Sequence, residues 1–228
     1  MPTVQREGIA FHYLDSAVQE EKGPGLPLVF QHGIGGTVKQ PISLLEPLPR
    51  GMRVISFDCR GHGRTMPTAL QEGLSFDVFA DDLVALLDHL HLPQAIIGGI
   101  SMGAGVALNV AVRYPNRVAG LILARLAWMD GPMAAQPLYL QIADLLQSHG
   151  AEAGRARFAE TQDYRHIVAA SPDAARSLLG QFDEPRAVEA VARPIASLWV
   201  LKTIRAPVLV LATRQDPVHP FIYAETLA

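Results

Sequence analysis

The pentapeptide Gly99-Ile100-Ser101-Met102-Gly103 holds the residue best suited to nucleophilic chemistry. Ser101 falls where a predicted strand, Ala95–Ile100, gives way to a predicted helix, Met102–Tyr114. A residue in such a turn has a strained backbone, and glycines two positions away on both sides avoid a collision. The helix would direct backbone N–H groups and its positive dipole end at charge developing during acyl transfer. The pattern predicts a serine nucleophile; the alternative is a glycine-rich turn that only packs a helix on a sheet.

A carboxylate follows another predicted strand, Pro207–Ala212, in the form of Asp216. A carboxylate at the end of a strand can orient an imidazole and stabilise its cation. The Asp216-Pro217 pair is also a common turn signal, so a solvated loop aspartate is the alternative.

With two further segments, these features resemble the α/β-hydrolase family. Gln31-His32-Gly33-Ile34-Gly35-Gly36 resembles the family's HG oxyanion loop, and the segment Phe57-Asp58-Cys59-Arg60-Gly61-His62-Gly63-Arg64 resembles its D-x-R-G-x-G turn. The resemblance implies that Asp216 is the acid of a catalytic triad. It also implies that the backbone N–H groups of Ile34 and Met102 form an oxyanion hole.

The general base is the difficult part of this assignment. In the family the histidine follows the acid after one more strand, and only 12 residues follow Asp216. We therefore expect the last strand, its covering helix and the base to be absent from the chain, which would leave little or no turnover. His219 is interpreted as a turn residue, whereas His32 and His62 are expected to brace loops.

Short apolar runs alternate with amphipathic ones, which is typical of an α/β protein with a mostly parallel sheet flanked by helices. Besides those named above, strands are predicted at Ile9–Leu14, Pro27–Gln31, Arg53–Phe57 and Val118–Leu123, and a helix at Ser75–Leu90. Between Trp128 and Lys202 helical segments replace strands, notably at 138–147 and 187–198. We expect an α/β-hydrolase core over 1–127, a helical cap insertion over 128–203 and the resumed core over 204–228.

The predicted function is hydrolysis of an ester, lactone or similar acyl compound through an acyl-enzyme at Ser101. The resemblance includes enol-lactonases, carboxylesterases and cofactor-free haloperoxidases. A non-catalytic ligand-binding protein of this fold, or a lyase or perhydrolase-like member, stays open. The candidates to line an apolar substrate pocket, or simply to form core, are Trp128, Met129, Met133, Leu138 and Tyr139.

Composition excludes several other classes of protein. Apolar residues make up 49% and charged residues 18%, which indicates a globular chain, and the net charge of −3 offers no basic surface for nucleic acid. No apolar stretch reaches about 20 residues, and the start does not resemble a signal peptide. The lone cysteine, Cys59, fits a reducing compartment, so a cytoplasmic protein is expected. Metal and nucleotide motifs are missing, so no cofactor is expected, and the sequence indicates no oligomeric state.

Overall fold

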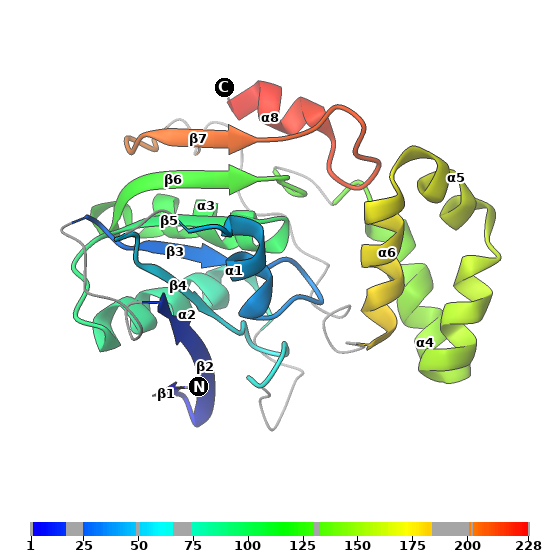
Figure 1. Ribbon diagram of the computed structural model, residues 1–228, viewed down its shortest axis with the longest axis horizontal. Helices are drawn as coiled ribbons and strands as arrows, with labels where there is room; N and C mark the ends of the chain where they lie inside the picture. The colour runs from blue at the N-terminus through cyan, green and yellow to red at the C-terminus, as the bar shows by residue number, and fades with distance from the viewer. Residues whose placement is uncertain are drawn as a thin grey trace.

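A seven-stranded sheet forms the centre of the computed structural model, which describes residues 2–16, 25–48, 51–65, 74–129, 133–183, 201 and 203–227 (Figure 1). The strands are β1 (Thr3–Arg6), β2 (Ile9–Asp15), β3 (Leu28–Gln31), β4 (Val54–Phe57), β5 (Ala95–Ile100), β6 (Val118–Ala124) and β7 (Val208–Leu211). Their order is β1-β2-β4-β3-β5-β6-β7. Strand β2 pairs antiparallel with both β1 and β4, and the neighbours in the order β4-β3-β5-β6-β7 all pair in parallel. The residues that follow β3, β5, β6 and β7 therefore meet at one edge of the sheet.

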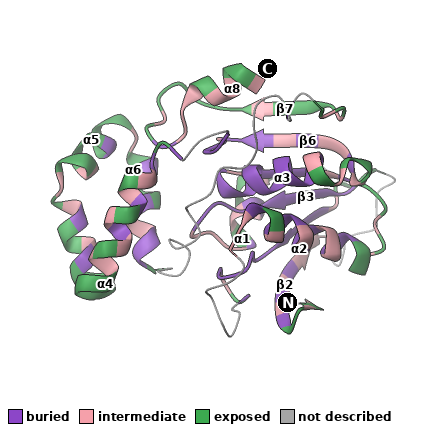
Figure 2. Cartoon of the chain, turned by 180° about the vertical axis from the view of Figure 1, so that it is seen from behind, coloured by how far each residue is buried: buried purple, intermediate pink, exposed green. Residues whose placement is uncertain are grey.

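The two faces of the sheet are covered by different helices. Because successive side chains of a strand point to opposite faces, Leu28 and Phe30 pack in a cluster with Ile42 and Leu45 of α1 (Lys39–Leu45), while Val29 joins the larger cluster on the other face. This larger cluster includes apolar residues of α2 (Phe76–His89) and α3 (Met102–Arg113). Buried residues accordingly concentrate in β3 and α3 (Figure 2). The central strands β3 and β4 are thus enclosed on both faces, as their continuous apolar runs predict.

Helix α2 shows how local sequence sets an element. Ser75 has an extended backbone, and its hydroxyl accepts a hydrogen bond from the Val78 N–H at 3.3 Å. Asp77 lies in the first turn and His89 in the last, which suits the helix dipole. The helix predicted at Ser75–Leu90 is confirmed, with Ser75 as its N-cap.

The regular elements described between β6 and β7 are all helices. They are α4 (Gln136–Ala159), α5 (Gln162–Ala170), α6 (Pro172–Gly180) and a 3₁₀ turn, η3 (Gln181–Asp183), which together we call the helical layer. The arrows of β6 and β7 point towards this layer, so it lies beside the carboxyl edge of the sheet (Figure 1). The predicted helix at 138–147 falls inside α4, and that at 187–198 lies outside the described residues.

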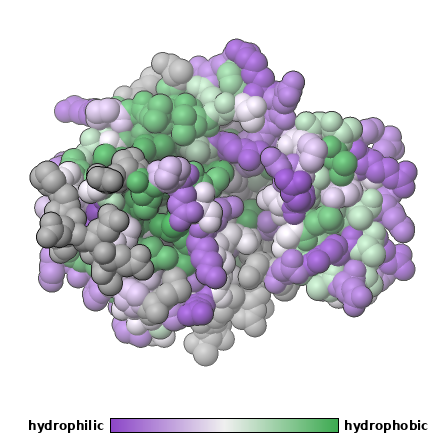
Figure 3. Space-filling model, in the orientation of Figure 1, coloured by the Kyte–Doolittle hydropathy of each residue, from purple (hydrophilic) through white to green (hydrophobic). Residues whose placement is uncertain are grey.

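Strand β7 lies at the edge of the described sheet and is its most exposed parallel strand. Val208, Leu209 and Leu211 are 44%, 52% and 48% exposed. Apolar side chains gather over this part of the surface (Figure 3). A short helix, α8 (Phe221–Leu227), follows the loop that leaves β7.

The six predicted strands all form, with ends no more than one residue from those expected. The elements that were not predicted include β1, α1 and α8. Strand β1 has four residues, none of them buried, and the residue before α1, Val38, offers no side-chain cap, so neither element has a strong pattern. None of the described helices is both long enough and apolar enough to span a membrane.

Candidate active site

Ser101 lies at the tip of a sharp turn between β5 and α3. Its φ of 55° and ψ of −113° are strained for any residue with a side chain. A Cβ on Gly99 would overlap the backbone of Gly103, and a Cβ on Gly103 would overlap the carbonyl of Gln31. Only glycine fits at both positions, so the tight turn predicted from the pentapeptide is confirmed.

The imidazole of His219 lies between Ser101 and Asp216. Its Nε2 is 2.9 Å from Ser101 Oγ, and its Nδ1 is 2.9 Å from Asp216 Oδ2. Because the carboxylate can only accept, Nδ1 carries the proton and Nε2 is the acceptor for the serine hydroxyl. The interpretation of His219 as merely a turn residue is wrong, as is the expectation that the chain holds no histidine beside the nucleophile.

A compact turn returns His219 to the acid that precedes it by three residues. Asp216 Oδ1 accepts the backbone N–H groups of Val218 at 2.9 Å and His219 at 3.1 Å. This is the aspartate-capped turn that competes with regular structure in loops. One oxygen of the carboxylate therefore fixes the loop, and the other is left for the imidazole.

Asp216 also forms an ion pair with Arg125, the first residue after β6. The Arg125 Nε and Nη2 atoms lie 2.6 Å and 2.5 Å from Asp216 Oδ2, and the carboxylate is 1% exposed. Burial alone would raise the pKa of Asp216, but the hydrogen bonds from His219, Val218 and Arg125 hold this pKa well below its usual range. The acid is therefore ionised and fixed in place.

The two expected oxyanion donors lie on either side of Ser101, at the ends of β3 and β5. Met102 is the first residue of α3, where the backbone N–H has no acceptor inside the helix. In the loop after β3, the Gly33 N–H donates to Gln40 Oε1 at 2.7 Å, whereas the Ile34 N–H has no acceptor among the described residues. The His32 Nδ1 donates to the Gly33 carbonyl at 2.7 Å, and this bond orients the peptide that carries the Ile34 N–H.

A pocket with about 490 Å³ of empty space, part of it open to solvent, adjoins Ser101. It is lined by Gly33, Ile34, Gln40, Ile100, Ser101, Arg125, Tyr139, Ala174, Ser177, Leu178, Val218 and His219. The sheet edge thus supplies one wall and helices α4 and α6 the other.

Of the five residues expected to line a substrate pocket, Tyr139 does so. Trp128, Met129 and Met133 are buried in the larger apolar cluster, where the Trp128 ring lies 5.2 Å from that of Phe76. Leu138 is partly buried against the same cluster. Most of the large side chains that follow β6 therefore belong to the hydrophobic core and not to the pocket lining.

Three polar residues of the pocket were not identified from the sequence: Gln40, Arg125 and Ser177. Each belongs to a different element, and Arg125 is 91 residues from the carboxylate that it binds. The one available signal was a basic residue directly after the apolar run of β6. Among the described residues, no group of three His, Cys, Asp or Glu side chains is arranged to hold a metal ion.

Comparisons with known proteins agree with this architecture. Residues 27–148 match the family model described as the alpha/beta hydrolase fold. The chain aligns over 92% of its length, with 33% identity, to 82% of a RutD protein of Variovorax paradoxus, whose name describes a carbamate hydrolase. It is 41% identical over 117 residues to the dihydrolipoyllysine-residue acetyltransferase component of the acetoin cleaving system of Pseudomonas putida, of which it spans 30%.

Among solved structures, a thermophilic esterase from Thermogutta terrifontis is 27% identical. It superposes with a TM-score of 0.71 over 99% of this chain and 83% of the esterase. These matches cover the nucleophile turn, the HG loop and most of the sheet. The chain therefore belongs to the α/β-hydrolase fold family.

Proposed function

We propose that this protein is a serine hydrolase that cleaves an ester, lactone or similar acyl compound through an acyl-enzyme at Ser101. His219 takes the proton of the Ser101 hydroxyl as the serine attacks the carbonyl carbon, and then gives it to the leaving alcohol. Asp216 stabilises the imidazolium formed in between. Water then attacks the acyl-enzyme, with His219 as base, and releases the acid.

The tetrahedral intermediate of each half-reaction carries a negative oxygen. The Ile34 and Met102 N–H groups are the donors proposed for this oxyanion, and each such donor typically contributes about 3 kcal/mol. His32 supports the first of them through the Gly33 carbonyl, and its Nε2 is itself held by the Cys59 N–H at 3.0 Å. Burial lowers the pKa of His32 to about 4, so the ring is neutral near pH 7 and serves as a brace.

We further propose that the helical layer acts as a cap. Ala174 and Leu178 of α6 close the pocket opposite Ser101 with apolar surface. Gln181 of η3 donates a hydrogen bond of 3.1 Å to the Ile34 carbonyl, which ties the layer to the oxyanion loop. A cap in this position would exclude water and strengthen the electrostatic interactions below it.

One observation carries the proposal: Ser101, His219 and Asp216 form an unbroken chain of hydrogen bonds that opens on a pocket. The alternative of a non-catalytic binding protein was based on a missing histidine, and the position of His219 removes that support.

The test is turnover of p-nitrophenyl butyrate together with labelling by a fluorophosphonate probe. We expect the chain to show both, and Ser101→Ala to lose both. Ser148→Ala, which changes an exposed serine of α4, is the matched control and should retain both. Neither turnover nor labelling of the wild-type chain would favour a binding protein.

A further inference from the structure

The pocket beside Ser101 carries a charged group that acyl transfer alone does not require. Of the described residues that line it, Arg125 is the one with a permanent formal charge, and no aspartate or glutamate is among them. The Arg125 side chain is 31% exposed, although its partner Asp216 is 1% exposed. The guanidinium therefore presents part of its surface to the pocket.

Arg125 has donors to spare for a ligand. A guanidinium offers five N–H groups, and the contacts with Asp216 engage Nε and Nη2. Both contacts go to the same carboxylate oxygen, which also accepts from His219. The outer part of the fork is thus available to a second planar acceptor, such as another carboxylate.

The backbone at Arg125 is also unusual. Its φ is +50°, a left-handed conformation that costs energy for any residue other than glycine. Ser101, at the end of the neighbouring strand β5, has a φ of +55°. Strained positions of this kind concentrate at functional sites, and here two of them flank one pocket.

Tyr139 supplies a second, independent observation. The residue is 4% exposed, lines the pocket and has no hydrogen-bond partner for its hydroxyl among the described residues. Burial, reinforced by the charge of Asp216, raises the pKa of the phenol, so it stays a neutral donor. Tyr139 and Arg125 line the same pocket. A phenol that lines a pocket without a partner among the described residues can donate a hydrogen bond to a ligand.

Ser177 of α6 lines the same pocket, and its hydroxyl likewise has no partner among the described residues. Ala174 and Leu178, on the same helix, add apolar surface. Donors from the sheet edge and from the helical layer thus line one pocket together with Ser101 and these apolar side chains.

From this arrangement we propose that Arg125 and Tyr139 form a carboxylate-binding subsite, so that the natural substrate is an acyl compound bearing a second, anionic carboxylate group. The assignment rests on the proposed hydrolase function, which it narrows to a substrate class. Arg125 would then have two tasks, one towards the Asp216 carboxylate and one towards the substrate.

The first experiment compares two esters of equal chain length, p-nitrophenyl hexanoate and the mono-p-nitrophenyl ester of adipic acid, at pH 7.5. We expect the wild-type kcat/KM to be at least tenfold higher for the adipate ester, through a lower KM. Tyr139→Phe should raise KM for the adipate ester about tenfold and change KM for the hexanoate ester less than twofold. Tyr164→Phe, in α5 and outside the pocket lining, is the matched control and should leave both values unchanged.

Arg125 variants separate recognition from support of Asp216. Arg125→Lys keeps the charge and should retain most of the preference for the adipate ester, whereas Arg125→Gln should abolish it. A merely structural role would lower kcat for both esters by the same factor and leave their ratio unchanged. Equal kcat/KM values for the two esters in the wild-type protein would overturn the proposal.

A binding measurement separates this proposal from the proposed function. Calorimetric titration of Ser101→Ala with adipate should show binding that Tyr139→Phe weakens, whether or not the protein hydrolyses esters. If Ser101→Ala binds adipate but the wild-type protein hydrolyses no ester, the carboxylate subsite is supported and the hydrolase function is overturned. If the wild-type protein hydrolyses the hexanoate ester but Ser101→Ala does not bind adipate, the hydrolase function is supported and the carboxylate subsite is overturned.

Discussion

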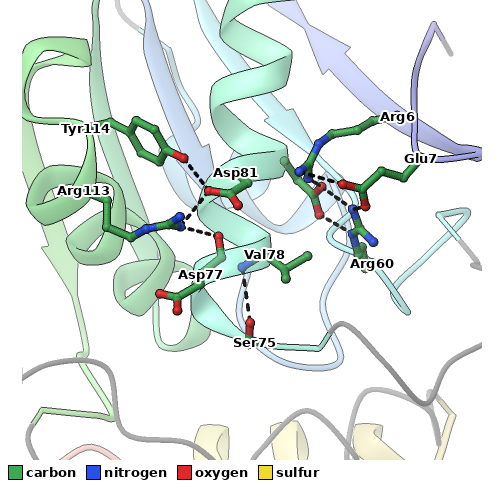
Figure 4. A network of polar contacts seen from close by, with 10 residues as sticks. Arg6, Glu7, Arg60, Ser75, Asp77, Val78, Asp81, Arg113 and Tyr114 are labelled. Atoms are coloured by element: carbon green, nitrogen blue, oxygen red, sulfur yellow. Dashed lines mark hydrogen bonds and ion pairs between the residues drawn. The ribbon is translucent and has the colours of Figure 1, made fainter.

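Two buried carboxylates of this protein each bind an arginine, and they serve different ends. Asp82 of α2 has a fully buried side chain and bonds Arg60 through both oxygens, at 2.7 Å and 2.9 Å. Arg6 also pairs with Asp82, and Glu7 bonds both arginines, so that Arg6, Glu7 and Arg60 lie side by side (Figure 4). We call these four residues the Asp82 network. It fastens the β1–β2 turn and the loop after β4 to α2.

The side chain of Asp216 is as deeply buried as that of Asp82, but its hydrogen bonds connect it to the nucleophile. Arg125 takes one side of Oδ2, and His219 takes the other and continues to Ser101 and the pocket. The Asp82 network closes on itself, whereas the Asp216 chain ends in a hydroxyl with nothing beyond it but space for a ligand. Burial and an arginine partner therefore do not mark a catalytic carboxylate; a continuous path to a nucleophile in a pocket does.

Substitution at Asp216 should give the largest effect. Asp216→Asn retains an acceptor for the loop, but its amide faces His219 Nδ1 and Arg125 with donors, so the imidazole loses its orientation. We expect kcat for p-nitrophenyl butyrate to fall by about 10³-fold or more, as is typical when a triad acid is removed. The melting temperature of the same sample shows whether the fold survives. A kcat within tenfold of wild type would show that catalysis does not depend on the hydrogen bonds that join Asp216, His219 and Ser101.

The same substitution in the Asp82 network should act on stability instead. Asp82→Asn leaves Arg60 and Arg6 without their shared charge, and breaking a buried ion pair costs about 3 kcal/mol. Urea unfolding should show this loss, while kcat per folded molecule stays within about twofold of wild type. A tenfold loss of kcat in folded Asp82→Asn would mean that the two carboxylates are coupled, and the contrast between them would fail.

A third buried polar group, beneath the oxyanion loop, carries no charge at neutral pH. Burial lowers the pKa of His32 to about 4, against 6.5 for an unperturbed histidine. Between these pH values the unfolded state binds the extra proton, so stability due to His32 is present above about pH 6.5 and is lost as the pH falls towards 4. The difference corresponds to about 3 kcal/mol.

Urea unfolding at pH 6.5, 5.5 and 4.5 measures this loss. His32→Gln should flatten the dependence on pH, although part remains because burial lowers the pKa of the neighbouring His62 to about 3. His149→Gln changes an exposed histidine and should keep the wild-type slope. An unchanged slope in His32→Gln would show that His32 is not the group that resists protonation.

The smallest predicted effect concerns the cap of α2, the helix that carries Asp82. Ser75→Ala removes the acceptor for the Val78 N–H, and loss of such a cap costs about 1 kcal/mol. Urea unfolding should show this loss with kcat unaltered. A loss above about 3 kcal/mol would indicate that the cap also supports the Asp82 network.

The sequence was sufficient to predict those parts of the site that depend on local geometry. Ser101 was identified because its two flanking glycines are needed within one turn. Ile34, singled out by its place in the HG loop, lines the pocket, and its role as an oxyanion donor stays a prediction. The Asp82 network and the Arg125–Asp216 pair could not be predicted in this way. They join residues up to 91 positions apart, and their pairing follows from the strand order rather than from any motif.

His219 shows a different limit of sequence reasoning. Its spacing from Asp216 was visible, but the order typical of the family suggested that the base lies further along the chain. The aspartate-capped turn, which returns the imidazole to its own acid, becomes evident only once Val218 and His219 are seen donating to Asp216 Oδ1. The opposite limit is shown by three large apolar residues whose place in the sequence suggested a pocket lining but which pack in the core: Trp128, Met129 and Met133.

The central claim is that His219 activates Ser101, and the rate of fluorophosphonate labelling measures that activation most directly. We predict that the wild-type chain is labelled at Ser101, as identified by peptide mass, and that His219→Gln reacts at least 100-fold more slowly while melting at a similar temperature. Labelling of folded His219→Gln at the wild-type rate would contradict the claim, because the serine would then owe its reactivity to some other base.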